Sequence, residues 1–140
     1  MANLLDQPIS AQIGMQKYKV TIQWRNGELI ADEPTSLGGL DSGPDPYTLL
    51  LASLAACTLS TLRMYIDRKE WGITVLKITL NLSQEMVDGK VQTTFDRDIR
   101  FNENISLEQQ ERLLSIAKKC PVSKILENNI LIQTKIQNHG

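Results

Sequence analysis

The chain has 140 residues, 41% of them hydrophobic, and its 15 basic and 16 acidic residues leave a net charge of −1. This length suits one globular domain, and the lack of a basic excess, with only 5% aromatic residues, argues against nucleic acid as a partner. The one histidine, His139, stands beside the C-terminal residue, which argues against Cys–His or Ser–His catalysis and against a histidine metal site. We therefore expect no metal, and we expect any chemistry to depend on Cys57, Cys120, carboxylates and arginines.

The first residues carry no sign of a targeting segment. Residues 1–13 have no basic start, no long apolar stretch and no small-residue cleavage site, so they do not predict a signal peptide. We expect a cytoplasmic protein, in which a cysteine pair is more often catalytic or redox-active than a structural disulfide. We treat residues 1–14 as an N-terminal extension and residues 15–137 as a single domain.

The N-terminal half predicts a hairpin followed by a long helix. Apolar residues alternate over residues 17–24, Asn26-Gly27 is a strong hairpin turn, and residues 28–32 form the returning strand. After a loop rich in Gly, Ser, Asp and Pro, Asp45 is the predicted N-cap and Pro46 the first residue of a helix that ends near residue 69.

This predicted helix is apolar on nearly all sides, which is typical of a central helix covered by the chain's own sheet, by a second subunit or by both. Residues 46–62 carry no charge, but a membrane span needs about 20 apolar residues. Charged residues follow directly, from Arg63 to Glu70. We therefore expect a buried helix of a soluble protein and no membrane partner.

The C-terminal half predicts two strands, over residues 74–82 and 91–101, with Asp88-Gly89 as their turn. A helix over residues 104–119 should start at a capping box of Ser106 and Gln109. Its predicted buried stripe consists of Leu107, Leu113, Leu114 and Ala117. A short helix over residues 122–127 and a last strand over residues 129–136 complete the order ββ-α-ββ-αα-β, an α+β fold with mostly antiparallel pairing.

The two cysteines lie in different local settings. Cys57 is in the middle of the central helix, whereas Cys120 lies at a helix break, where Pro121 places it near the next N-cap. Exposed amides at an N-cap favour a thiolate. From these facts alone, packing in the core is the simpler interpretation of both cysteines. A disulfide between them would need Cα atoms within about 7 Å, which the sequence does not tell.

Two segments that contain the cysteines carry a more specific pattern. They are Asp-Pro-x-x-Leu-Leu-x-Ala-Ser-Leu-Ala-Ala-Cys over residues 45–57 and Cys-Pro-Val-x-x-x-Leu-Glu over residues 120–127. Together they resemble the superfamily of osmotically inducible protein C and organic hydroperoxide resistance protein, and the resemblance covers roughly residues 15–136. It implies that both cysteines line one site, in an intertwined homodimer with its sites at the subunit boundary.

The resemblance implies a thiol peroxidase that reduces organic hydroperoxides to alcohols in oxidative-stress defence. Cys57 would be the peroxidatic cysteine, oxidised to a sulfenic acid, and Cys120 the resolving cysteine, which converts it to a disulfide. An external dithiol would reduce the disulfide by exchange, with no flavin, haem or metal. The apolar surroundings of Cys57 would suit the alkyl group of a small organic hydroperoxide.

The resemblance also implies an arginine from the N-terminal hairpin that favours the Cys57 thiolate, and Arg25 stands at the matching place. Without the resemblance, Arg25 is an exposed hairpin arginine. The hydroperoxide-resistance branch has a glutamate directly after the helix-starting proline, where this chain has Tyr47, which we assign to the substrate pocket. This departure favours a divergent branch and leaves an alternative function: a redox-sensing or small-apolar-ligand-binding protein with little peroxidase turnover.

Overall fold

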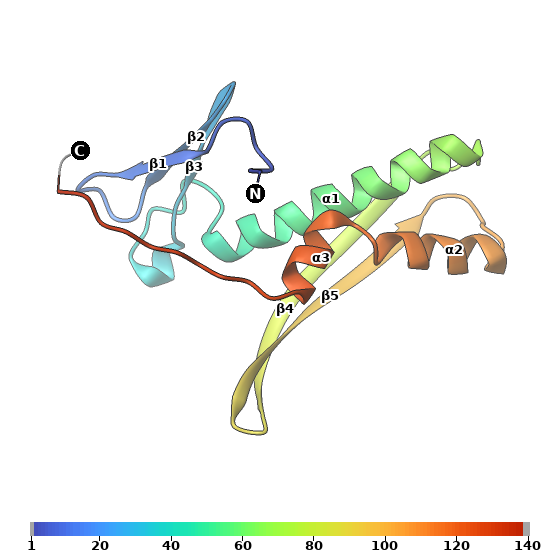
Figure 1. Ribbon diagram of the computed structural model, residues 1–140. Helices are drawn as coiled ribbons and strands as arrows, with labels where there is room; N and C mark the ends of the chain where they lie inside the picture. The colour runs from blue at the N-terminus through green and yellow to red at the C-terminus, as the bar shows by residue number, and fades with distance from the viewer. Residues whose placement is uncertain (1, 139–140) are drawn as a thin grey trace. The chain divides into compact units, whose positions relative to one another are not determined.

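The computed structural model describes residues 2–138 in two compact units, which we treat separately: residues 2–52 form unit 1 and residues 53–138 form unit 2. Figure 1 shows strands and helices in the order βββ-α-ββ-αα. The predicted α+β class is confirmed. The expectation of one domain over residues 15–137 stays a prediction.

Unit 1 contains a three-stranded antiparallel sheet with β2 in the middle. Its strands are β1 (Ser10–Ile13), β2 (Val20–Trp24) and β3 (Gly27–Ala31). The β2–β3 hairpin is confirmed, but its turn lies one residue earlier than expected, because Gly27 pairs with Trp24. A Cβ on Gly27 would lie 2.6 Å from the Trp24 ring, so this glycine serves the strand pairing. Strand β1 was not predicted and lies in the segment treated as an extension.

A buried carboxylate organises the loop that follows β3, which includes a short 3-10 helix (Thr35–Leu37). Asp32 accepts backbone N–H bonds from Tyr18 (3.2 Å), Glu33 (2.8 Å) and Ser42 (3.2 Å), and a hydroxyl bond of 2.6 Å from Ser42. These donors, the Ser42 hydroxyl above all, hold the pKa of Asp32 well below its usual range. The carboxylate thus stays charged although it is buried.

Helix α1 (Pro46–Lys69) begins in unit 1 and continues into unit 2, and it has the predicted bounds. The backbone N–H of Thr48 donates to the Asp45 side chain at 3.1 Å, which confirms the predicted N-cap. Its buried residues repeat every four positions along one stripe: Leu54, Thr58, Leu62 and Ile66. The helix is long and apolar enough to cross a membrane by length and composition, and one stripe of it packs inside the protein.

Unit 2 is built on a long antiparallel hairpin of β4 (Leu76–Val87) and β5 (Lys90–Phe101). The predicted turn, Asp88-Gly89, is confirmed, and both residues have positive φ, as in a two-residue hairpin turn of type I′. Figure 1 shows the turn far from the unit's helices. Two helices follow, α2 (Leu107–Ala117) and α3 (Pro121–Glu127).

The core of unit 2 joins α1, α2 and the segment before β4. Its fully buried members are Leu62, Ile66, Ile73, Leu113 and Ala117. The capping box of Ser106 and Gln109 at the start of α2 is confirmed. The predicted α2 stripe is wrong for Leu107 and Leu114, which are 72% and 57% exposed, because the helix presents only the Leu113–Ala117 line to the core.

The predicted last strand is wrong for this structure. Residues 129–137 follow α3 without regular secondary structure, and neither described sheet includes them. An extended segment becomes a strand only when a neighbouring strand pairs with its backbone groups. Its apolar side chains are 52–90% exposed: Ile130, Leu131, Ile132 and Ile136. His139 lies outside the described residues.

Candidate active site

The structure brings the two predicted cysteines together in unit 2. Cys57 comes from the middle of α1, and Cys120 is the N-cap of α3, as predicted. Both are free thiols; Cys57 is partly exposed and Cys120 is fully buried. The two neighbouring thiols affect each other: Cys57 favours the thiolate form of Cys120, and Cys120 disfavours that of Cys57.

Cys120 lies among hydrogen-bond donors. Its Sγ accepts the backbone N–H of Ser123 at 3.4 Å, and the Ser123 hydroxyl lies 3.3 Å away. The Thr58 hydroxyl, one turn along α1 from Leu54, lies 3.6 Å from the same sulfur. The N-cap position therefore supplies the amide that the sequence predicted, and α1 supplies a second hydroxyl.

Arg97 on β5 joins this group, and the sequence analysis missed it. Its Nη1 donates to Thr58 Oγ1 and to Ser123 Oγ, both at 2.8 Å. A signal was present in the alternation of β5, since Arg97 shares the partly buried face with Phe95, Ile99 and Phe101. A charged residue on an otherwise apolar strand face needs buried polar partners.

The two thiols differ in acidity. Burial opposes the thiolate of Cys120, but hydrogen bonds from the side chain and backbone of Ser123 and from Thr58, together with the neighbouring Cys57 thiol, outweigh it and lower its pKa to about 7. Burial raises the pKa of Cys57, and the neighbouring Cys120 raises it further, against the backbone N–H of Val122. Within unit 2, Cys120 is thus the more acidic thiol.

Arg25 and Tyr47 belong to unit 1. Arg25 lies in the β2–β3 turn and Tyr47 in the first turn of α1, and both side chains are exposed. Their expected roles, in activating Cys57 and in lining the substrate pocket, stay predictions.

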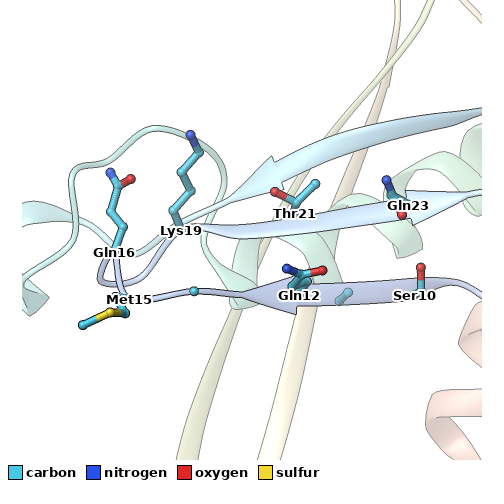
Figure 2. Close-up of a pocket in the computed structure, with 9 residues that line it drawn as sticks. Ser10, Gln12, Met15, Gln16, Lys19, Thr21 and Gln23 are labelled. Carbon is cyan, nitrogen blue, oxygen red and sulfur yellow. The ribbon is translucent and has the colours of Figure 1, made fainter. Parts of the chain in front are cut away.

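Unit 1 also has a polar hollow of about 430 Å³, which Figure 2 shows on the sheet formed by β1 and β2. Its labelled side chains are Ser10, Gln12, Met15, Gln16, Lys19, Thr21 and Gln23. It contains neither cysteine. Among residues 2–138, no group of three or more His, Cys, Asp or Glu side chains is placed to hold a metal ion.

Comparison with known proteins identifies the family. The family model described as OsmC-like protein matches residues 39–135, which is more than half of the chain. The chain belongs to the OsmC-like family. The match covers both cysteine segments completely, and it confirms the resemblance stated from the sequence. No curated protein matches the chain.

Solved structures of OsmC-like proteins share the fold. An organic hydroperoxide resistance protein OsmC from Legionella pneumophila has a TM-score of 0.67 and 21% identity, over 91% of this chain and 93% of that one. An OsmC-like protein from Mycoplasma pneumoniae has a TM-score of 0.67 and 23% identity, over 88% and 89%. An organic hydroperoxide resistance protein from Elizabethkingia anophelis has a TM-score of 0.69 and 22% identity, over 92% and 93%. These likenesses confirm the OsmC-like fold.

Proposed function

We propose that this OsmC-like protein is a two-cysteine peroxidase that reduces small organic hydroperoxides to alcohols in oxidative-stress defence. The observation that carries the proposal is the pair of free, interacting thiols of Cys57 and Cys120. The names of the relatives from Legionella pneumophila and Elizabethkingia anophelis, both organic hydroperoxide resistance proteins, support the substrate class.

The first step takes place at Cys57, because it is the more exposed of the two thiols and a peroxide reaches it first. Its thiolate sulfur attacks the terminal peroxide oxygen, the O–O bond breaks, and the alkoxide takes a proton and leaves as the alcohol. Cys57 becomes a sulfenic acid. The sulfur of Cys120 then attacks that of Cys57: an S–S bond forms, the S–O bond breaks, and hydroxide leaves.

An external dithiol completes the cycle by thiol–disulfide exchange, so the reaction needs no bound cofactor. Because burial raises the pKa of Cys57, the first step needs a further group that favours its thiolate. We assign this role to Arg25 and a place in the pocket to Tyr47. We place the protein in the cytoplasm, where thiols are kept reduced.

The proposal includes a homodimer with its sites at the subunit boundary. Only 22% of the most apolar window of α1 is buried. Large apolar side chains are also exposed near the β4–β5 turn and after α3: Met86, Val91, Leu131 and Ile132. A second copy of the chain would cover such surfaces, as apolar surfaces at obligate interfaces are covered.

Titration of thiols with cumene hydroperoxide tests the function. One equivalent should remove two thiols rapidly in the wild type, and a dithiol should restore both. Hydrogen peroxide at the same concentration should react more slowly, since it has no alkyl group to bind. A wild-type protein that keeps both thiols contradicts the proposal.

The raised pKa of Cys57 and the tyrosine at position 47 favour a second candidate, a redox-sensing or small-apolar-ligand-binding protein. Such a protein would lose both thiols slowly and only once. Repeated turnover in the presence of a dithiol distinguishes the peroxidase from the sensor.

A further inference from the structure

A polar cluster lies inside unit 2, beside the apolar core. It consists of Arg97 from β5, Thr58 from α1, and Cys120 and Ser123 from α3, and we call it the Arg97 cluster. Thr58 and Cys120 are 0% exposed and Ser123 is 4% exposed. Polar groups with so little access to water cost free energy unless they are hydrogen-bonded, so the bonds within the cluster define its state.

The direction of these bonds follows from what each group can donate. A guanidinium has no acceptor, so both hydroxyl oxygens accept from Arg97. The Thr58 hydroxyl shares its hydrogen between the Leu54 carbonyl at 2.7 Å and Cys120 Sγ at 3.6 Å. Cys120 Sγ lies 3.3 Å from the Ser123 hydroxyl, and toward a thiolate, which has no proton to give, this hydroxyl is the donor.

The sulfur of Cys120 therefore receives two donors from Ser123, the hydroxyl and the backbone N–H. Two hydrogen-bond donors stabilise a thiolate more than a neutral thiol, so they favour the ionised form of Cys120. The Arg97 guanidinium contacts the hydroxyls of Thr58 and Ser123, and each of these hydroxyls lies beside the sulfur. A single hydroxyl therefore separates the positive charge from the sulfur.

The other titratable groups around Cys120 are weaker candidates for favouring its thiolate. Cys57 faces it from α1 as a neutral donor. Lys118 and Lys119 precede it and Lys124 follows it, and all three side chains are exposed to solvent. Glu127 on α3 lines the same hollow as Arg97 and Ser123, and it is exposed to solvent. Among residues 2–138, no carboxylate forms an ion pair with Arg97, so its charge is directed to the two hydroxyls.

We propose that Arg97 is a positioning residue for the resolving cysteine: by holding Ser123 and Thr58, it keeps a large fraction of Cys120 as the thiolate before the peroxide arrives. This inference rests on the proposed function for its kinetic consequence. Cys120 attacks the sulfenic sulfur of Cys57 without first losing a proton, and the departing hydroxide takes a proton from water. The sulfenic acid is then short-lived, which protects it from further oxidation.

The ionisation of Cys120 is measured without peroxide, in a Cys57→Ser background where Cys120 is the remaining thiol. The ultraviolet absorbance of the thiolate, followed against pH, should have a midpoint near 7. Arg97→Met should raise the midpoint by about one pH unit, and Arg97→Lys should restore part of the shift because it keeps the charge. Arg100→Met is the matched control, since Arg100 is an exposed arginine of the same strand, and it should leave the midpoint unchanged.

Ser123→Ala provides a second variant in case Arg97→Met does not fold. It removes the hydroxyl that donates to the sulfur and is the smallest change available in the cluster, so its midpoint should also rise. A midpoint that stays at the wild-type value in folded Arg97→Met or in Ser123→Ala overturns the inference.

The kinetic consequence is measured in the chain with both cysteines. After one equivalent of cumene hydroperoxide, Arg97→Met should accumulate sulfenic acid at Cys57, trapped by dimedone, while the wild type and Arg100→Met proceed to the disulfide. Equal trapping in all three proteins overturns the kinetic part. If the wild type does not react with peroxide but Arg97 still sets the midpoint, the proposed function fails and the positioning role of Arg97 stands.

Discussion

Asp32 in unit 1 and Cys120 in unit 2 are both buried, and each receives two hydrogen bonds from one serine, through its hydroxyl and its backbone N–H. For Asp32 this serine is Ser42, and two further backbone amides complete the set. For Cys120 it is Ser123, whose hydroxyl is in turn held by Arg97. The pKa of the Asp32 carboxyl falls well below its ordinary value of 3.8, whereas the pKa of the Cys120 thiol falls from 9.0 to about 7.

The same pair of donors thus has different consequences because the two acids start from different ordinary pKa values. Asp32 stays charged throughout the neutral range and holds the loop between β3 and α1. Cys120 lies close to its point of half-ionisation, beside a second thiol. Hydrogen bonding by a serine therefore produces a fixed support in unit 1 and a reactive group in unit 2.

The largest effect should come from removing the thiols themselves. Cys57→Ser should lower peroxide consumption to the background rate, because the attacking sulfur is lost. Cys120→Ser should permit one turnover and then accumulate sulfenic or sulfinic acid at Cys57, as mass spectrometry of the intact chain would show. If Cys57→Ser keeps the first turnover and Cys120→Ser loses it, the two roles are reversed.

Quaternary structure should give a similarly clear result. We expect sedimentation at micromolar concentration to show a homodimer, because the apolar surfaces of unit 2 near the hairpin turn and after α3 need a partner. A monomer mass would contradict the shared site and would leave these surfaces unexplained.

Removing the hydroxyl of each serine in turn tests the comparison directly. Ser42→Ala should lower the melting temperature and leave the thiol titration unchanged, because it loosens only the Asp32 loop. Ser123→Ala should lower the thiolate fraction at neutral pH by up to about tenfold, as expected for a shift of about one pH unit. Calorimetry and thiolate absorbance on both variants are the measurements, and effects in the opposite order would contradict the comparison.

Stability should depend on pH in two separate windows. The folded pKa of Asp32 is lowered, so its contribution is present above its ordinary value of 3.8 and is lost as pH falls further. The folded pKa of Cys120 is lowered from 9.0 to about 7, so its contribution grows as pH rises across that interval. Urea unfolding measures the free energy of unfolding at each pH. Its decrease at acid pH should be absent in Asp32→Asn, and its increase from neutral to alkaline pH should be absent in Cys120→Ser.

Arg25 and Tyr47 should change the acidity of Cys57. In a Cys120→Ser background, Arg25→Ala should raise the pKa of Cys57, by roughly one to three pH units if the pair is partly desolvated. Tyr47→Glu should lower it, because a carboxylate would orient the guanidinium through two charge-assisted hydrogen bonds. The rate of iodoacetamide alkylation against pH is the measurement, and an unchanged profile in Arg25→Ala removes Arg25 from the site.

Features that depend on neighbouring residues were predictable from the sequence. The cap of α1 by Asp45, the capping box at Ser106, the Asp88-Gly89 turn and the N-cap position of Cys120 each involve residues at most three positions apart. Their geometry is set by local backbone hydrogen bonds, so the residue types alone indicate it.

Features that depend on distant partners were not predictable in this way. Strand β1 exists because β2 lies beside it, and residues 129–137 are apolar enough for a strand but pair with no described strand. The pattern of β5 places Arg97 on the inner face, but it does not tell that Thr58 and Ser123 are the groups it meets. The sequence therefore predicted the two cysteines and missed the arginine that joins their elements.

The position of Cys120 as the N-cap of α3 links the redox state of the protein to the order of its C-terminal region. In the reduced protein, the sulfur accepts the Ser123 amide and closes the first turn of α3. A sulfur bound in a disulfide is a poorer acceptor than a thiolate, so oxidation weakens that closure. Amide hydrogen exchange at the start of this seven-residue helix should then accelerate in the oxidised protein. The oxidation state of the cysteines would thus change the local order of the segment after α3, which a binding partner could recognise.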